Sequence, residues 1–368
     1  MHGHGDTTWT FAILRLSLFH PSVNGGEPMK AFKACAIAAT LAVTSMPAWA
    51  GPTVDAVKAK GFVQCGVNLG LYGFSAPDDK GNWSGLDVDA CRAVAAAVFG
   101  DASKVKYTPL SAQQRLPALQ SGEIDLLARN TTWTLSRDTA NGLNFTVTNY
   151  YDGQGFMVPT KLGVKAAKEL NGATVCVLPG TTTEQNLADW FRANKMTYKP
   201  VVIEKNEELA SAFIAGRCDV YTSDASQLAA IRANEMPNPA DYLILPELIS
   251  KEPLAVAVRH GDDQWMDVVR WSIYAMIAAE EKGVTMANVD QMAASSPDPE
   301  IKRLLGVTAG NGKALGLDEA WAKTIIKQVG NYGESFDRNV GSGSKLKIAR
   351  GQNALYTQGG LMYAPPFK

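Results

Sequence analysis

Residues 124–138 read I-D-L-L-A-R-N-T-T-W-T-L-S-R-D, and the two halves of this stretch differ in character. Residues 124–128 form a short and mostly apolar run, which is typical of a buried β-strand. Residues 129–138 then bring hydroxyl groups, an amide and two guanidinium groups close together. Because α/β proteins bind ligands at the carboxyl ends of their strands, the stretch predicts a strand that leads into a polar binding loop.

Alternating elements surround this strand. The apolar patterns predict further strands at 62–68 and 105–110, with helices at 86–99 and 111–121. Ser111 and Gln114 have the spacing of a capping box at the start of the second helix. The resulting β-α-β-α-β order predicts a mostly parallel sheet with helices on both faces.

The same pattern then repeats, with the two units joined near residues 155–159. We expect strands at 174–178, 201–203 and 220–222, and helices at 184–194, 207–215 and 226–233. Two α/β units in tandem predict two lobes with a cleft between them. A strand at 254–258 would return the chain to the first lobe, and two such crossings form a hinge. The expected fold is α/β, with lobe 1 at 51–156, lobe 2 at 157–255, and the return to lobe 1 with a helical C-terminal extension at 256–368.

Residues 29–50 have the layout of a secretory signal peptide. Lys30 and Lys33 precede an apolar run at 35–43, and Ala48 and Ala50 place small residues before a cut at Gly51. The run is shorter than the ~20 residues that span a bilayer. Residues 1–28 are interpreted as the product of an upstream start codon assigned in error, or as cloning residues.

Charge and cysteine content narrow the class of protein. The chain has 35 Lys and Arg against 36 Asp and Glu, which argues against nucleic acid as a partner. Residues 51–368 keep four cysteines, and an even count in an exported chain predicts two disulfides. Three connectivities are possible. We favour Cys65–Cys91 and Cys176–Cys218, because each pair falls within one predicted lobe. A metal site is disfavoured, since the cysteines form no Cys-x-x-Cys pair and His260 is the one histidine after residue 50.

Three polar segments are candidates for the ligand site. In the first, Arg137 could bind a carboxylate through two parallel hydrogen bonds, with Thr132 and Asn130 fixing the ligand's orientation. In the second, residues 180–184 (G-T-T-T-E) place free N–H groups at a helix start, which favours an anion. In the third, Asp224 could accept a hydrogen bond from an ammonium group. Each segment could instead be a helix cap, as in a box between Thr181 and Glu184. Together, a site for an anion and a site for a cation describe an α-amino acid.

Six runs of sequence resemble the polar-amino-acid family of periplasmic solute-binding proteins, and within it the general L-amino-acid-binding subgroup. The resemblance covers nearly all of residues 51–368. The runs are G-L-D-V-D-A-C-R-A-V-A from 85, L-P-A-L-Q-S-G-E-I-D-L-L-A-R-N-T-T-W-T-L-S-R-D from 116, G-T-T-T-E from 180, D-V-Y-T-S-D-A-S-Q-L-A from 219, V-G-N-Y-G-E-S-F from 329 and G-G-L-M-Y-A-P-P from 359.

The resemblance implies a type II two-lobed fold that closes on an L-amino acid in the periplasm and passes it to the permease of an ABC importer. It implies a monomer that holds no cofactor or metal. Arg137 would bind the α-carboxylate with help from Thr132 and Thr182, and Asp224 would bind the α-ammonium. Tyr72 or Phe74 would cover the ligand side chain. Asn130 stands where many relatives have serine. Arg129, beside it, could reach an acidic ligand side chain or pair with a neighbouring carboxylate.

Two other classes of function are considered. A dehydratase-like enzyme on the same fold would act on a cyclic carboxylic acid and would need a carboxyl group as its acid. Glu184 and Asp224 are the candidates for that role, and both have non-catalytic explanations. A sensory receptor domain would be tethered by membrane helices, which the sequence after residue 50 does not predict. The expected function is therefore binding rather than catalysis.

Overall fold

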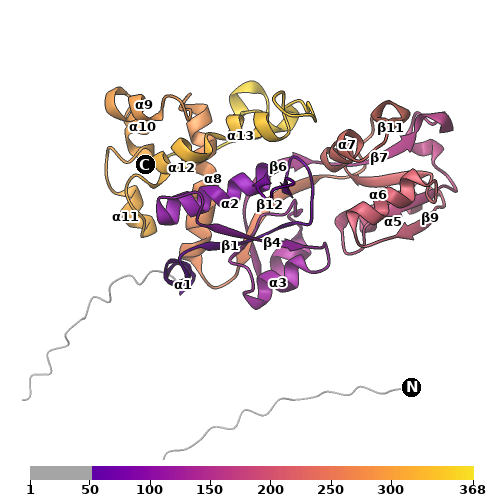
Figure 1. The fold of residues 1–368 in the computed structure, drawn as a ribbon, viewed down its shortest axis with the longest axis horizontal. Helices are drawn as coiled ribbons and strands as arrows, with labels where there is room; N and C mark the ends of the chain where they lie inside the picture. The colour runs from indigo at the N-terminus through magenta and orange to yellow at the C-terminus, as the bar shows by residue number, and fades with distance from the viewer. Residues whose placement is uncertain (1–51) are drawn as a thin grey trace, which may run out of the picture. The chain divides into compact units, whose positions relative to one another are not determined.

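The computed structural model describes residues 52–368, in which helices alternate with the strands of two five-stranded sheets. The predicted signal peptide and the segment before it lie outside the described residues. The described chain begins with helix α1 (Pro52–Lys60). Each sheet forms the centre of one lobe, and the expected two-lobed α/β architecture is confirmed (Figure 1).

The sheet of lobe 1 is mixed rather than mostly parallel. Strand β1 pairs in parallel with its neighbours β4 and β5, as predicted, whereas β12 runs antiparallel to both β5 and β6. Helices α2 (Leu86–Phe99) and α3 (Arg115–Ser121) lie on opposite sides of this sheet (Figure 1). The strands follow the order β4 (Val105–Leu110), β1 (Val63–Asn68), β5 (Leu126–Leu127), β12 (Glu252–Arg259) and β6 (Leu143–Asp152).

The sheet of lobe 2 contains the predicted strands and two that the sequence did not reveal, β7 and β11. The helices of this lobe are α5 (Thr182–Ala193), α6 (Asn206–Ile214) and α7 (Ala225–Asn234), close to their predicted positions. The strands follow the order β11 (Tyr242–Ile244), β7 (Gln154–Pro159), β10 (Val220–Asp224), β8 (Thr174–Val177) and β9 (Lys199–Val202).

The chain passes between the sheets twice. It leaves lobe 1 at Gly153, between β6 and β7, and returns through residues 245–251, between β11 and β12. Residues 155–159, interpreted from the sequence as a junction, are part of the buried strand β7, because their apolar side chains pack in the core of lobe 2. The expected boundaries after residues 156 and 255 therefore fall inside strands.

Shorter elements complete the two lobes. Ser111 and Gln114 exchange the two hydrogen bonds of the predicted capping box, although the helix itself begins at Arg115. The other short elements are β2 (Ala76–Pro77), β3 (Trp83–Ser84), α4 (Leu135–Ala140), and the 3₁₀ turns Thr160–Leu162, Ala167–Glu169 and Pro239–Asp241.

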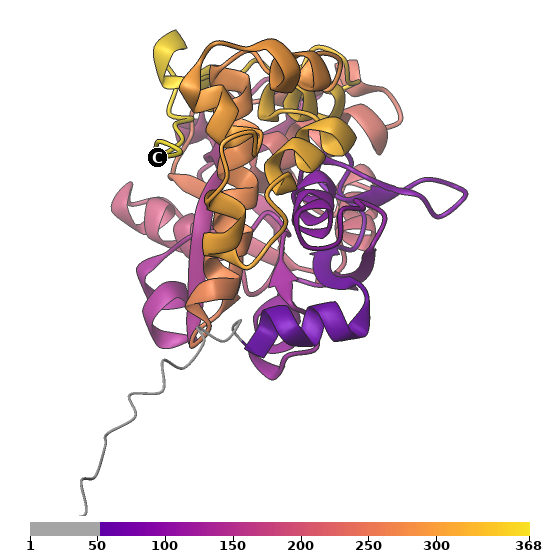
Figure 2. The ribbon, with the colours of Figure 1, turned by 90° about the vertical axis from the view of Figure 1, so that its left-hand side faces the viewer.

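The C-terminal extension packs on lobe 1, where its apolar side chains join the core formed by α1, α2 and β1. Figure 2 shows these helices in front of the strands of the sheet. Beyond Asn339 the expected helical pattern fails, because glycines and prolines interrupt it, and two 3₁₀ turns remain (Gly351–Asn353 and Tyr356–Gln358). The helices are α8 (Asp263–Glu281), α9 (Val289–Ser295), α10 (Pro299–Leu304), α11 (Asn311–Leu315), α12 (Trp321–Val329) and α13 (Tyr332–Asn339).

A buried carboxylate anchors the extension. Asp89 of α2 accepts hydrogen bonds at 2.6 Å from three side chains of α13, those of Ser335, Arg338 and Asn339. Because both helices also pack on α8, the last helix of the chain is fixed to one of the first. Within residues 52–368, no helix combines the length and the apolar character that crossing a bilayer requires.

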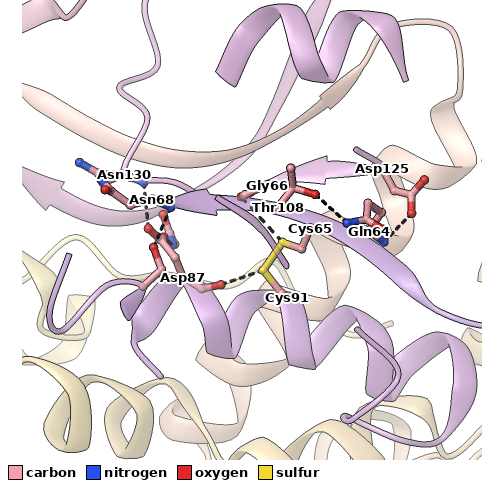
Figure 3. Close-up of a disulfide and its surroundings, with 11 residues drawn as sticks. Gln64, Cys65, Gly66, Asn68, Asp87, Cys91, Thr108, Asp125 and Asn130 are labelled. Atoms are coloured by element: carbon pink, nitrogen blue, oxygen red, sulfur yellow. Dashed lines mark hydrogen bonds between the residues drawn. A yellow bond between two sulfur atoms is a disulfide. The ribbon is translucent and has the colours of Figure 1, made fainter. Parts of the chain in front are cut away.

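Both predicted disulfides are present, one in each lobe. Cys65 on β1 is bonded to Cys91 on α2 beneath the sheet of lobe 1, with their Cα atoms 6.1 Å apart (Figure 3). Cys176 on β8 is bonded to Cys218 ahead of β10, with their Cα atoms 5.6 Å apart. Each bond thus joins two elements of the same lobe.

We expect the loss of either bond to destabilise the protein. The loops span 26 and 42 residues, so chain entropy predicts a loss of about 3–4 kcal/mol for each of the variants C65S/C91S and C176S/C218S. Chemical denaturation monitored by tryptophan fluorescence measures this loss, and peptide mapping of unreduced wild-type protein should recover both linked pairs. Free thiols at these four positions in unreduced, denatured protein would contradict the assignment.

Candidate functional site

The three polar segments expected from the sequence meet between the lobes. The segment 129–137 follows β5 of lobe 1, residues 180–184 lead from β8 into α5 of lobe 2, and Asp224 ends β10. The hydroxyl groups of Thr132 and Thr182 lie 3.2 Å apart and connect the first two segments. The sites that the sequence indicated at separate strand ends therefore form one polar region.

Arg137 is buried in this region without a counter-ion. It lies in α4, whose start is capped by Thr134, and its side chain is 7% exposed. One guanidinium N–H donates to the carbonyl oxygen of Thr132 at 2.9 Å. Among residues 52–368 it forms no ion pair. Burial lowers the pKa of Arg137, while Glu252 and Asp224 raise it. An anion placed here would gain a charge partner with donors to spare.

Asp224 presents the opposite charge from lobe 2. It occupies the N-cap position of α7, but its carboxylate makes no capping hydrogen bond. The side chain is 5% exposed, and Oδ1 has no hydrogen-bond partner within the described part of the chain. Burial raises the pKa of Asp224 well above its ordinary value, the carboxyl groups of Asp152 and Glu252 add to this, and Arg115 and Arg137 oppose it. The carboxylate of Asp224 therefore does not serve as a helix cap, and it is free to pair with a cation.

A carboxylate that sequence reasoning missed links the two lobes. Glu252, at the start of β12 and 1% exposed, accepts hydrogen bonds from Thr132 at 2.5 Å and from Thr182 at 2.8 Å through one oxygen. Its other oxygen accepts from Asn186 of α5 at 2.7 Å and from Ser250 at 2.6 Å. The hydroxyl hydrogens of both threonines thus go to Glu252.

Asn130 belongs to a ring of four buried amide side chains that spans both lobes. Asn68 donates to Asn130 at 3.0 Å, Asn130 to Gln227 at 3.5 Å, Gln227 to Asn206 at 3.2 Å, and Asn206 to Asn68 at 3.4 Å. Asn130 has φ +34°, a backbone conformation that asparagine tolerates better than most residues. Its N–H also donates to the carboxylate of Asp87 (Figure 3). Each amide keeps one N–H outside the ring.

Two more arginines lie beside Arg137. Arg129 is buried and donates through Nε to the carbonyl oxygen of Leu110 at 3.0 Å. Burial lowers its pKa to about 10, against the attraction of Asp87, and it forms no ion pair with any carboxylate in the described part of the chain. The structure thus anchors Arg129 in lobe 1 through a carbonyl group. Arg115, at the start of α3, is the other arginine and was not singled out from the sequence.

The two aromatic candidates occupy different places. Phe74 is 1% exposed and packs edge-on against Tyr150 in the core of lobe 1. Tyr72 is 48% exposed and lines a cavity of about 400 Å³ together with Leu69 of lobe 1 and Glu207 and Ser211 of α6. Tyr72 therefore stands at the rim between the lobes.

The arrangement suits binding of a small zwitterion. It offers a buried cation, a buried anion and a ring of amides, each with hydrogen-bonding capacity that the protein does not use. Across residues 52–368, no three side chains of His, Cys, Asp or Glu gather as metal ligands would.

The chain is similar to amino-acid-binding proteins of ABC transporters. The chain is 60% identical over 335 residues to the "General L-amino acid-binding periplasmic protein AapJ" of Rhizobium johnstonii, covering 90% of this chain and 98% of that protein. It is 59% identical over 316 residues to the "Glutamate/glutamine/aspartate/asparagine-binding protein BztA" of Rhodobacter capsulatus, covering 86% and 93%.

Among solved structures, a periplasmic binding protein of an ABC transporter from Brucella ovis, with glutathione bound, matches with a TM-score of 0.84. The two chains are 59% identical, and the match covers 86% of this chain and 99% of that one. The family model of the bacterial extracellular solute-binding proteins, family 3, matches residues 63–284. These residues include both sheets and all three polar segments, and the chain belongs to family 3 of the bacterial extracellular solute-binding proteins.

Proposed function

We propose that this chain is a periplasmic receptor that binds L-α-amino acids between its two lobes and delivers them to the permease of an ABC importer. One observation carries the proposal: Arg137 from lobe 1 and Asp224 from lobe 2 are buried near each other, and neither has an ion-pair partner among the residues that the structure describes. An α-carboxylate on Arg137 and an α-ammonium on Asp224 would neutralise both groups. The names of the similar proteins from Rhizobium and Rhodobacter support this ligand class.

Burial explains why such a ligand would bring the lobes together. A buried charge without a partner is costly, and a zwitterion that bridges the lobes relieves two such charges at once. This gain exists only while the lobes are in contact, so the ligand shifts the equilibrium toward the closed arrangement. We propose further that the receptor works as a monomer and that it performs no chemistry on its ligand. The carboxylate of Asp224 then acts as the ion-pair partner of the ligand's ammonium group and not as a catalytic acid.

Arg137→Met tests the carboxylate site. Loss of the buried charge partner should weaken binding of every amino acid by at least about 100-fold while the protein still folds. Isothermal titration calorimetry measures the affinity, and a thermal-shift screen against L- and D-amino acids identifies the ligands. Wild-type protein at 100 times the dissociation constant should gain about 2.7 kcal/mol of stability.

The matched control is Arg192→Met, an exposed arginine of α5, which should bind as wild type does. Normal affinity in Arg137→Met would refute its assigned role. If cyclic carboxylic acids raise the melting temperature of the wild-type protein and no amino acid does, the dehydratase-like alternative is favoured.

Asp224→Asn should abolish binding and yet stabilise the ligand-free protein by about 1 kcal/mol at neutral pH. The pKa of Asp224 is raised by folding, so its contribution favours the folded state at low pH and is lost as pH rises toward the folded-state value. The gain in the variant should therefore shrink as pH falls toward the ordinary carboxyl range. Thermal unfolding between about pH 4 and about pH 8 measures it, with the exposed Asp241→Asn as control. An unchanged affinity would show that the ammonium binds elsewhere.

Glu252→Gln should weaken binding of all ligands by a similar factor, about 10- to 100-fold. The carboxylate contacts protein groups of both lobes, and an amide cannot accept from the Thr132–Thr182 pair and from Asn186 together. Calorimetry with two chemically different amino acids separates this uniform loss from a change in selectivity. Glu204→Gln, on the surface of lobe 2, is the control. A loss confined to one ligand would mean that Glu252 contacts the ligand itself.

A further inference from the structure

The N-terminus of helix α7 is capped by the first crossing between the lobes. The helix begins at Ala225, and the N–H groups of its first turn need acceptors from outside the helix. The carbonyl oxygen of Gly153 accepts from the N–H of Ala225 at 2.8 Å. Oδ2 of Asp152 accepts from the N–H of Ser226 at 3.3 Å. A helix of lobe 2 thus begins on the residues through which the chain leaves lobe 1.

Asp152 occupies the role that Asp224 would have as an ordinary N-cap. An N-cap side chain accepts from the N–H two or three residues after it, and Ser226 lies two residues after Asp224. Asp152 holds this N–H and also accepts a hydrogen bond from the hydroxyl of Ser226. Asp224 therefore has no need to cap the helix, and its Oδ1 keeps no partner among the described residues.

Each oxygen of the Asp152 carboxylate is bonded to the protein itself. Oδ1 accepts from the N–H of Gly153 at 2.8 Å, and Oδ2 accepts from the two donors of Ser226. Burial raises the pKa of Asp152, these hydrogen bonds lower it, and the charge of Glu252, its partner across the sheet, raises it further. Burial also raises the pKa of nearby Tyr150, which therefore stays neutral. Asp152 is thus placed to orient a neighbour and not to bind a ligand.

The negative charge of Asp152 also acts on Asp224. Burial is the main cause that raises the pKa of Asp224, and the charge of Asp152 comes next, ahead of that of Glu252. Arg115 and Arg137 face the same carboxylate and oppose this effect. Removal of the charge at residue 152 would therefore lower the pKa of Asp224, because one of two like charges beside it would be gone.

We infer that Asp152 is a positioning residue of the ligand site, which caps α7 in place of Asp224 and so leaves the Asp224 carboxylate free for the ligand's ammonium group. The inference rests on the proposed function and adds a residue that acts on the ligand only through Asp224. Capping requires an acceptor at residue 152, which both aspartate and asparagine provide. The effect on the proton affinity of Asp224 requires the negative charge, which only aspartate provides.

The test compares Asp152→Ala and Asp152→Asn with wild type by isothermal titration calorimetry, with L-glutamine and L-alanine as ligands. At about pH 8, Asp152→Ala should bind both amino acids about 10-fold more weakly, because Asp224 turns to cap α7. Asp152→Asn, which keeps an acceptor for Ser226, should stay within about threefold of wild type. The matched control is Asp189→Ala, an exposed aspartate of α5, which should bind as wild type does.

The same titrations between about pH 5 and about pH 8 test the role of the charge. Affinity of the wild-type protein should fall as pH is lowered, because a protonated Asp224 cannot pair with an ammonium group. In Asp152→Asn the pKa of Asp224 is lower, so the fall in affinity should begin at a pH lower by about one pH unit. A variant that only weakened the fold would lose affinity without this displacement of the pH profile.

Three results would overturn the inference. One is an Asp152→Ala protein that binds both amino acids as wild type does at the alkaline end of the range. The second is an Asp152→Asn protein that binds as weakly there as Asp152→Ala. The third is a pH profile of Asp152→Asn that coincides with that of wild type, which decides the matter even if Asp152→Ala does not fold. In each case the proposed function stands, because wild type still binds amino acids. A wild-type protein that binds neither amino acid would instead refute the proposed function.

Discussion

Arg115, Arg137 and Asp224 are taken out of water by two lobes that offer them no ion-pair partner. Most proteins avoid this arrangement, because an unpaired charge in the interior is among the costlier features a fold can carry. The rest of the molecule supplies the stability that makes it tolerable. Two sheets with their own cores, two disulfides and a C-terminal extension support a site that is not optimal for folding. Such a compromise between stability and function is expected at binding sites.

The contacts between the lobes at the site are polar, which suits a surface that must also face water. Glu252 bonds to Thr132 of one lobe and to Thr182 and Asn186 of the other, and the ring of amides bridges the lobes a second time. When the lobes separate, these polar groups form hydrogen bonds with water instead. The free-energy difference between the open and the closed arrangement of the lobes therefore stays small. Apolar surfaces would hold the lobes together even without a ligand. The polar character of this interface thus makes closure of the lobes depend on the ligand.

Sequence reasoning predicted the fold, and it singled out two of the buried charged groups of the candidate site. Short apolar runs predicted strands such as β1 and β10. Arg137 and Asp224 were singled out because they lie just after predicted strands or at their ends. Arg115 and Glu252 escaped notice because their surroundings, Q-Q-R at a helix start and K-E-P before a strand, resemble solvent-exposed sequence. Phe74 packs in the core of lobe 1, and its position shows the converse limit, since an aromatic residue in a loop gives no sign of which core it enters. Tertiary contacts determine all three positions, and local pattern does not encode them.

The connectivity of the disulfides bears on how the proposed periplasmic receptor would mature. Among the four cysteines of the described chain, each pairs with its neighbour in sequence, Cys65 with Cys91 and Cys176 with Cys218. A chain that crosses a membrane N-terminus first presents these thiols in that order. An oxidant that joins thiols as they emerge would therefore make the native bonds directly, and the protein would need little help from a disulfide isomerase.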